Sequence, residues 1–401
     1  MHAASLREMA FVVAHTPAPV SLRRMRRPGR SRSVRALQDD STFGKPAAPK
    51  ELWSGFARTF RDGFLEEMAK PDCDVARAAL LLAGEDDAVT SRTAVPLPVD
   101  AYLGRLDSLA SDFMVAYCDT EAHEEDRAAQ LDTFLYDHCR FRTPTAWTEV
   151  NSPYRTYLHH VLAQKVGRLE SLAQVHCALL QRLQHRGVLV GADVYVAPGG
   201  RHPVTRTAGT QVVSTPVFIP GGWASSASTP SGAVTPRLLL LATLQALLRA
   251  FWAWEWRPEE PSGFLRAARA AAGDSGRTGT VIGSTVMQAS GRPFGDLERA
   301  QLQLERLVAL AQPEVTTATR DLACLLAHRG NKDLALNMLR DYVNSAAGKD
   351  LQARAATSAP ALAGAALPAS QSAFAEQEQA AVEALLISLE RSRLEKTFTQ
   401  Q

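Results

Sequence analysis

The amino-acid sequence predicts a mainly α-helical protein that carries one small antiparallel β-sheet and ends in helix hairpins. Three observations lead to this fold class: helical periodicity from about residue 71 to residue 187, a change to period two between residues 192 and 219, and helical spacing again from residue 237. With 401 residues, of which 46% are hydrophobic and 21% charged, the chain has an ordinary globular composition and exceeds the usual size of a single core. We therefore expect two folded regions.

The first 36 residues have the composition of an organelle transit peptide. They contain eight arginines and a single acid, Glu8, and the apolar stretch Met9–Ala14 is too short for a secretory signal. Proline, serine and arginine content favours the chloroplast stroma, with the mitochondrion as the alternative, and cleavage is expected near residues 34–36. The other interpretation is a disordered basic arm that binds nucleic acid. Without this segment 36 basic and 41 acidic residues remain, a charge of −5, which argues against nucleic-acid binding by the folded body.

Residues 37–70 are expected to form a linker with a short helical lead-in over residues 51–68, so that the first folded region spans residues 71–236. Proline and glycine separate its helices. The expected helices are Asp74–Gly84, Val99–Tyr117, Asp126–Cys139, Tyr154–Val166 and Glu170–Arg186. The alternating segments Ala192–Ala197, Val204–Thr207 and Gln211–Ile219 predict a small antiparallel sheet after them.

A second, helical region is expected over residues 237–345. It opens with the most apolar segment of the chain, Arg237–Trp256, which contains Gln245, Arg249 and Glu255 and is therefore interpreted as a buried helix rather than a membrane span. The pattern Gly-x4-Ala-x3-Leu begins at Gly295 and recurs at Gly330, an offset of 35 residues. This offset indicates either tetratricopeptide-like repeats, whose unit is about 34 residues, or a helix hairpin packed on the main domain.

The C-terminal segments differ in composition. Residues 346–370 are rich in Ala, Ser and Pro and are expected to be a disordered linker. Residues 371–401 should contain one amphipathic helix over Phe374–Lys396, with Ala381, Leu385 and Leu389 on its apolar stripe. Because this helix has no core of its own, it either docks on the body or recruits a partner.

The order of several segments resembles the SirB family, a group of transglutaminase-like domains with a tetratricopeptide tail, in its plant and algal organelle form. The resemblance covers residues 72–344 and rests on the order of its motifs, none of which is diagnostic alone. These motifs are Ala76–Glu85, Leu97–Leu109, Asn151–Gly167 and Arg320–Val343. It implies a transglutaminase-like fold followed by helix hairpins, but no settled reaction.

Active members of the wider superfamily use a Cys-His-Asp triad. The resemblance places the nucleophile at Leu169, the histidine at His202, displaced by two residues, and the acid at Pro220. Two of the three roles are therefore unfilled, which implies a degenerate site and a pseudoenzyme. The alternative is a rearranged cysteine hydrolase or acyltransferase that uses Cys177 or His202. The five cysteines form no metal-binding spacing, and no metal or cofactor is expected.

These patterns together favour a non-catalytic interaction, assembly or auxiliary factor whose partner is a protein of the same organelle. Nucleic acid is disfavoured, and a small-molecule ligand is left open. The candidate partner-binding residues lie on the repeat helices. They are Arg299, Arg306, Arg320, Asn331 and Lys332.

Overall fold

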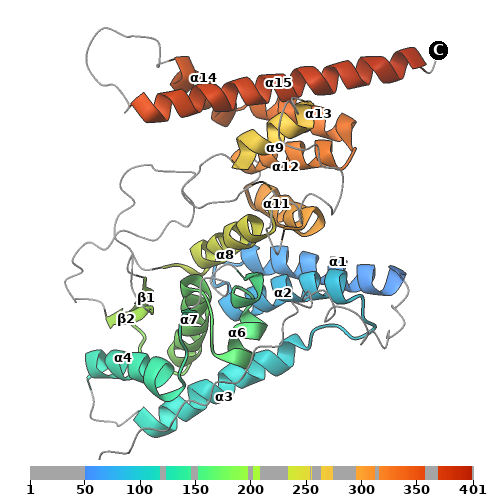
Figure 1. Cartoon of the computed structure of the whole chain (residues 1–401). Helices are drawn as coiled ribbons and strands as arrows, with labels where there is room; N and C mark the ends of the chain where they lie inside the picture. Colours follow the sequence, from blue (N-terminus) through green and yellow to red (C-terminus); the bar gives the residue numbers. More distant parts are fainter. Residues whose placement is uncertain are drawn as a thin grey trace, which may run out of the picture. The chain divides into compact units, whose positions relative to one another are not determined.

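The computed structural model describes residues 50–117, 123–145, 152–196, 202–207, 234–252, 254, 263–273, 295–311, 316–356 and 369–399. Within these residues 13 α-helices and one two-stranded antiparallel sheet confirm the mainly α-helical prediction (Figure 1). The expected leader (residues 1–36) and the expected third strand, Gln211–Ile219, lie outside the described residues. Ala47–Gln401 forms one compact unit.

The described fold begins with a hairpin of two helices, α1 (Lys50–Ala69) and α2 (Val75–Ser91). The side chains of Phe64 and Met68 on α1 are buried in the core. The helix expected over residues 51–68 is therefore present as α1, but it belongs to the core, so folded structure begins before Pro71. The apolar positions of α1 recur at helical spacing and need a partner, which α2 supplies.

The next elements lead to a central helix, α7. A helix is present in each expected segment, but the helix expected over 74–84 extends to Ser91, and the helices expected over 126–139 and 154–166 are each divided into two elements. The structure contains α3 (Val99–Tyr117), α4 (Glu124–Thr133), a π-helical turn η1 (Phe134–His138), a 3-10 turn η2 (Pro153–Arg155), α6 (Leu158–Gln164) and α7 (Leu169–His185). Because α7 packs against α2, α3, α6, α8 and the sheet, even polar side chains on it are buried.

The sheet consists of β1 (Ala192–Tyr195) and β2 (Val204–Thr207), which pair antiparallel with Ala192 opposite Thr207. Strand β1 packs on α7 and β2 packs on α4. The sheet therefore attaches α4 to the central helix.

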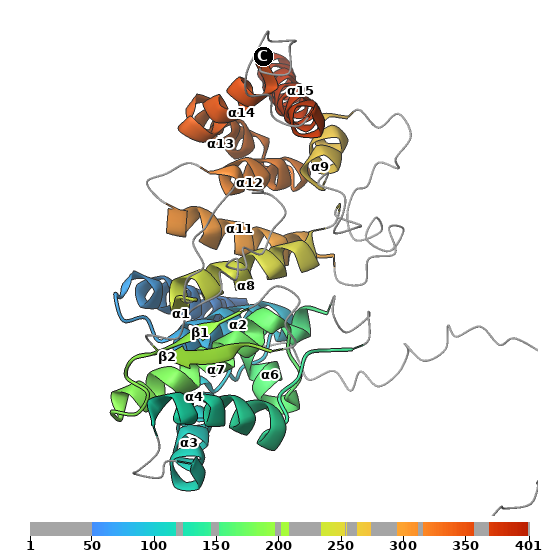
Figure 2. The same ribbon diagram turned by 90° about the vertical axis from the view of Figure 1, so that its left-hand side faces the viewer.

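The C-terminal part is entirely helical where it is described. It contains α8 (Pro236–Phe251), α9 (Gly263–Ala272), α11 (Leu297–Ala311), α12 (Thr317–His328), α13 (Lys332–Asn344), α14 (Ala346–Ala356) and α15 (Ala369–Thr399). Helix α8 contacts both α7 and α11, which confirms it as a buried helix and continues the core across residue 236 (Figure 2). No helix in the described ranges has the length and apolar character needed to cross a bilayer.

One expectation for the C-terminal end needs revision, and one open alternative is decided in part. Residues 346–356 form α14 instead of a disordered linker, because alanine is the best helix former and Leu351 is buried between neighbouring helices. Residues 357–368 lie outside the described part. Helix α15 docks on α9, α13 and α14 and buries Val382, Leu385 and Leu389 (Figure 1).

Candidate functional site

The start of α7 is the position where the resemblance places a nucleophile. Leu169 is the first residue of this helix, and its partly buried side chain packs against the core. The preceding Gly167 lies so close to Val161 that a Cβ atom there would be 2.8 Å from the valine methyl groups. The local geometry thus requires glycine for packing, while the leucine side chain offers no group that can attack a substrate.

The thiol of Cys177 lies two turns further along α7. The residue is 6% exposed, and burial raises the pKa of its thiol to about 12. Burial likewise raises the pKa of the thiols of Cys73, Cys139 and Cys324, the other cysteines that the structure describes. A thiol with a raised pKa holds little of the thiolate that attacks or binds metal.

A chain of hydrogen bonds runs through the buried ring of His176. The hydroxyl of Thr205 on β2 donates to Asp132 Oδ1 at 2.9 Å, and the backbone N–H of Thr205 donates to the same oxygen at 3.0 Å. The Nε2 atom of His176 lies 2.5 Å from the Thr205 hydroxyl, and its Nδ1 atom lies 3.0 Å from the hydroxyl of Tyr136. Because the threonine hydroxyl donates to the carboxylate, we assign the histidine proton to Nε2 and the tyrosine as donor to Nδ1.

Burial sets the protonation of this cluster. It lowers the pKa of His176 to about 3 and raises the pKa of Asp132 to about 6. The imidazole is thus neutral near pH 7, and both its nitrogens are engaged. The cluster connects α4, η1, α7 and β2, and we interpret it as a structural clasp, because His176 has no free nitrogen to serve as a general base.

His202, the expected triad histidine, lies beside this cluster and away from Leu169. Its ring stacks on Tyr136 with the ring centroids 4.2 Å apart. Tyr136 contacts α7 at His176, which is seven residues and about 10 Å along the helix from Leu169. The structure therefore does not bring the histidine to the expected nucleophile position. Pro220, the expected acid position, lies outside the described residues.

Three of the five candidate partner-binding residues are buried, which contradicts their placement on an exposed surface. Arg299 forms a two-pronged ion pair with Asp86 of α2, from Nε at 2.7 Å and from Nη2 at 2.5 Å. Its guanidinium group also lies over the ring of Phe251, 3.9 Å from the centroid. The arginine thus fastens α11 to α2 and α8 inside the protein.

Arg306 makes an equivalent pair one heptad later. Its Nε donates to Glu85 Oε2 at 2.9 Å and its Nη1 donates to Gln303 at 2.9 Å. The other carboxylate oxygen of Glu85 accepts from Arg61 Nε at 2.9 Å, and Arg61 also pairs with Glu305 at 3.1 Å. Glu85 is fully buried and Arg306 is 1% exposed, so these charges compensate one another in the core.

The third buried arginine, Arg320, holds α15. It donates to Asp321 from Nε at 2.9 Å and from Nη2 at 2.7 Å, its Nη1 pairs with Glu378 of α15, and it lies over Phe264 of α9. Of the two remaining candidates, Asn331 is exposed. The half-buried Lys332 donates to Ser392 of α15.

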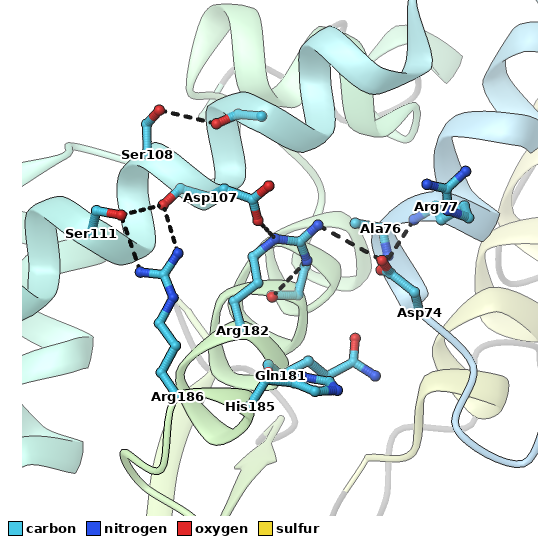
Figure 3. Close-up of polar contacts among 12 residues, drawn as sticks. Asp74, Ala76, Arg77, Asp107, Ser108, Ser111, Gln181, Arg182, His185 and Arg186 are labelled. Carbon is cyan, nitrogen blue, oxygen red and sulfur yellow. Dashed lines mark hydrogen bonds and ion pairs between the residues drawn. The ribbon is translucent and has the colours of Figure 1, made fainter.

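A polar clamp holds α7 against α2 and α3 (Figure 3). Arg182 Nε donates to Asp107 of α3 at 2.7 Å, and its Nη2 lies 3.7 Å from Asp74, the residue that caps α2. One turn later Arg186 donates to the hydroxyl of Ser111 at 3.1 Å. Because the two arginines and their two partners on α3 share a four-residue spacing, the clamp fixes the register of the two helices.

An apolar hollow of about 440 Å³ lies between α1, α2 and the turn that leads into α3. Its lining includes Phe56, Phe60 and Leu81, and Arg77 at its rim lies 3.8 Å from Asp100. Within the described residues, no cluster of three or more His, Cys, Asp or Glu side chains is placed to hold a metal ion.

Comparison with known proteins returns no relative. No protein-family model matches the chain, and neither a curated protein nor a solved structure does. The SirB resemblance therefore stays a prediction, and function has to be argued from the residues themselves.

Sequence reasoning missed the acids and hydroxyls that partner the buried cations and the histidine. One signal was present in the sequence: Glu85 and Asp86 are adjacent acids inside the apolar helix α2, where a charge needs a partner. No local signal identified Asp132, Tyr136 or Thr205, because their shared partner His176 is 29 to 44 residues away.

Proposed function

We propose that this protein is a non-catalytic interaction or assembly factor of the chloroplast, built on a transglutaminase-like domain that lacks its nucleophile. The observation that carries this proposal is Leu169: it begins α7 and packs its side chain inward, and it stands where the SirB resemblance expects a nucleophile. The mitochondrion is the alternative compartment, because the basic leader is typical of both organelles.

Two further observations support an interaction role. The hollow beside α1 and the exposed large hydrophobic side chains of α15 are apolar surfaces in contact with water, and such surfaces often mark interaction sites. Scattered exposed hydrophobic residues are normal in proteins, but α15 presents Ile387, Leu394 and Phe398 on one helix.

The experiment that tests the proposal is affinity purification of the tagged full-length precursor expressed in its own cell, followed by recovery of the processed protein from isolated organelles. We expect one or a few proteins to co-elute in near-stoichiometric amount. A processed protein that elutes alone as a monomer would contradict the interaction role. Import into isolated chloroplasts, with shortening and protease protection as the expected result, tests the compartment separately.

Thiol labelling distinguishes the rearranged cysteine enzyme. If the protein is non-catalytic, Cys177 should react with iodoacetamide at pH 7 no faster than the other buried cysteines, because burial raises the pKa of its thiol to about 12. Preferential modification of Cys177 in the folded protein would favour the enzyme instead.

A further inference from the structure

Helix α15 has two faces of opposite environment. The inner face follows steps of three and four residues and packs on α9, α13 and α14. Its buried members are Ala375, Ala381, Val382, Leu385 and Leu389. Polar contacts add to this docking: Arg340 pairs with Glu390 at 2.7 Å. The inner face therefore accounts for the attachment of the helix to the body.

The opposite face carries a second row of residues, here called the outer seam. Its spacing alternates between four and three residues from residue 373 to residue 398, which is the heptad spacing of a coiled coil. The five members from residue 377 to residue 391 each lie two residues, or about 200° of helix rotation, beyond residues 375, 378, 382, 385 and 389 of the inner face. All members are exposed. They are Ala373, Gln377, Ala380, Ala384, Ile387, Arg391, Leu394 and Phe398.

The outer seam is apolar in its C-terminal half although nothing in the described residues covers it. Ile387 is 64% exposed, Leu394 59% and Phe398 75%. In Figures 1 and 2 α15 lies at the edge of the drawn helices, with α13 and α9 on one side of it. The alanines of the N-terminal half allow a second helix to approach closely, and Arg391 is the one charged member of the row.

Acidic residues flank the outer seam. Glu376 and Glu383 precede every second seam position at an interval of seven residues, and Glu390 continues this row but is paired with Arg340 of α13. Glu395 on the other flank lies 3.5 Å from Arg391 of the seam, so the unneutralised acidic flank is that of Glu376 and Glu383. In an antiparallel pair of α15 helices the rows that contain Glu376 and Glu383 would face each other, and these like charges disfavour a second copy in that orientation. A helix with basic flanks is complementary to these two carboxylates.

We propose that the outer seam of α15 binds an amphipathic helix of a partner protein whose flanking positions carry Lys or Arg, as a short two-stranded coiled coil. This rests on the proposed function and names the surface and the chemistry of the partner. Arg391 has an acceptor on its own helix, because its Nε lies 3.5 Å from Glu395 Oε1, so the partner can place an apolar residue opposite it.

The direct test measures binding of the full chain to two synthetic peptides by fluorescence anisotropy. Both peptides are four-heptad helices with Ile and Leu in the seam; one has Lys and the other Glu at every flanking position, so neither pairs with itself. We expect the Lys-flanked peptide to bind about tenfold or more tightly than the Glu-flanked one. Equal affinity for the two peptides would overturn the proposal.

Variants locate the binding to the outer seam. The double variant Ile387→Lys with Leu394→Lys should lower the affinity for the Lys-flanked peptide about tenfold or more. The control Val115→Lys, at a 91% exposed position on α3, should leave this affinity unchanged. Circular dichroism and thermal melting check that both variants fold. If the seam variant binds as tightly as the Val115→Lys control, the seam is not the site. Glu376→Lys with Glu383→Lys should invert the preference between the peptides.

Two further measurements separate this proposal from the proposed function. A full-chain dimer in light scattering that is lost in the seam variant would assign the seam to a second copy and overturn the inference. If the wild type and the seam variant co-purify with the same partners from organelles, the outer seam is not the binding surface, while the proposed interaction role is still supported. Loss of one partner from the variant, together with the peptide preference, would support both.

Discussion

Replacement of Glu85 by leucine should destabilise the protein more than replacement of the arginine it binds. The carboxylate of Glu85 is fully buried and accepts hydrogen bonds from Arg61 and Arg306. In Glu85→Leu the guanidinium of Arg306, 1% exposed, keeps the neutral side chain of Gln303 as its acceptor. An uncompensated buried charge of this kind costs about 3–5 kcal/mol of unfolding free energy.

The reverse substitution is milder, because the network is asymmetric. In Arg306→Met the Glu85 carboxylate still pairs with Arg61 at 2.9 Å, so we expect a loss of about 1–3 kcal/mol. The double variant removes both fully buried charges and leaves Arg61 with Glu305 at 3.1 Å. It should therefore be more stable than Glu85→Leu alone by about 1 kcal/mol or more.

Urea unfolding followed by circular dichroism at pH 7 gives the unfolding free energies of the four proteins in this cycle. Glu66→Leu, which removes an exposed acid of the same helix hairpin, is the control and should change stability by less than about 0.5 kcal/mol. The reasoning would be refuted if Arg306→Met cost as much as Glu85→Leu, or if the double variant lost the sum of the two single losses.

Two more predictions follow from burial and close packing. Burial lowers the pKa of His176 and His159 to about 3, so the unfolded chain binds protons that the folded chain does not, and stability should fall as the pH drops below about 6.5. Burial also lowers the pKa of His160 and His328, and it raises the pKa of three aspartates, among them Asp132 to about 6, which opposes the effect below about pH 6. Because four histidines act against three carboxyl groups, a thermal midpoint that rises on acidification from pH 7 would contradict the assignment. Gly84→Ala should cost about 1–3 kcal/mol in urea unfolding, because its Cβ would lie 2.9 Å from a phenylalanine ring of α1. Gly104→Ala, with no atom within 4 Å of the new Cβ, should instead stabilise α3 by up to about 1 kcal/mol, and equal effects of the two substitutions would contradict the packing argument.

Local periodicity was sufficient to place most helices and two strands. The expected ranges for α3 and β2 coincide with the observed ones, and α7 differs by one residue at each end. These elements bury a regular row of apolar side chains, which is the property that periodicity measures. The helical segment from residue 51 also had this spacing, but its short stretch before Pro71 offered no sign that α2 would complete the hairpin.

The buried arginines show where local patterns fail. Arg299 and Arg306 lie on one face of α11 among polar neighbours, a pattern typical of a solvated surface. Their partners Asp86 and Glu85 are more than 200 residues away in the chain. A buried charge could be recognised in the sequence only through its oppositely charged partner. Because that partner is more than 200 residues away, no periodic pattern links the two residues.

Helix α15 shows a related limit of prediction from periodicity, because a second row of apolar residues is easily overlooked once the first has been found. Leu385 and Leu389 are sufficient to predict an amphipathic helix, and this stripe indeed docks on the body. From the sequence, docking on the body and recruitment of a partner are alternatives, because only one apolar face is recognised on the helix. Ile387 and Leu394 lie about 140–200° of helix rotation from those two leucines, so the helix can dock through one face and offer the other at the same time. A helix that needed the inner face alone would gain nothing from an exposed isoleucine and leucine, whose exposure disfavours solubility. The exposed isoleucine and leucine, on the same helix as the acidic flank of Glu376 and Glu383, are the observations that support a binding role for the outer seam.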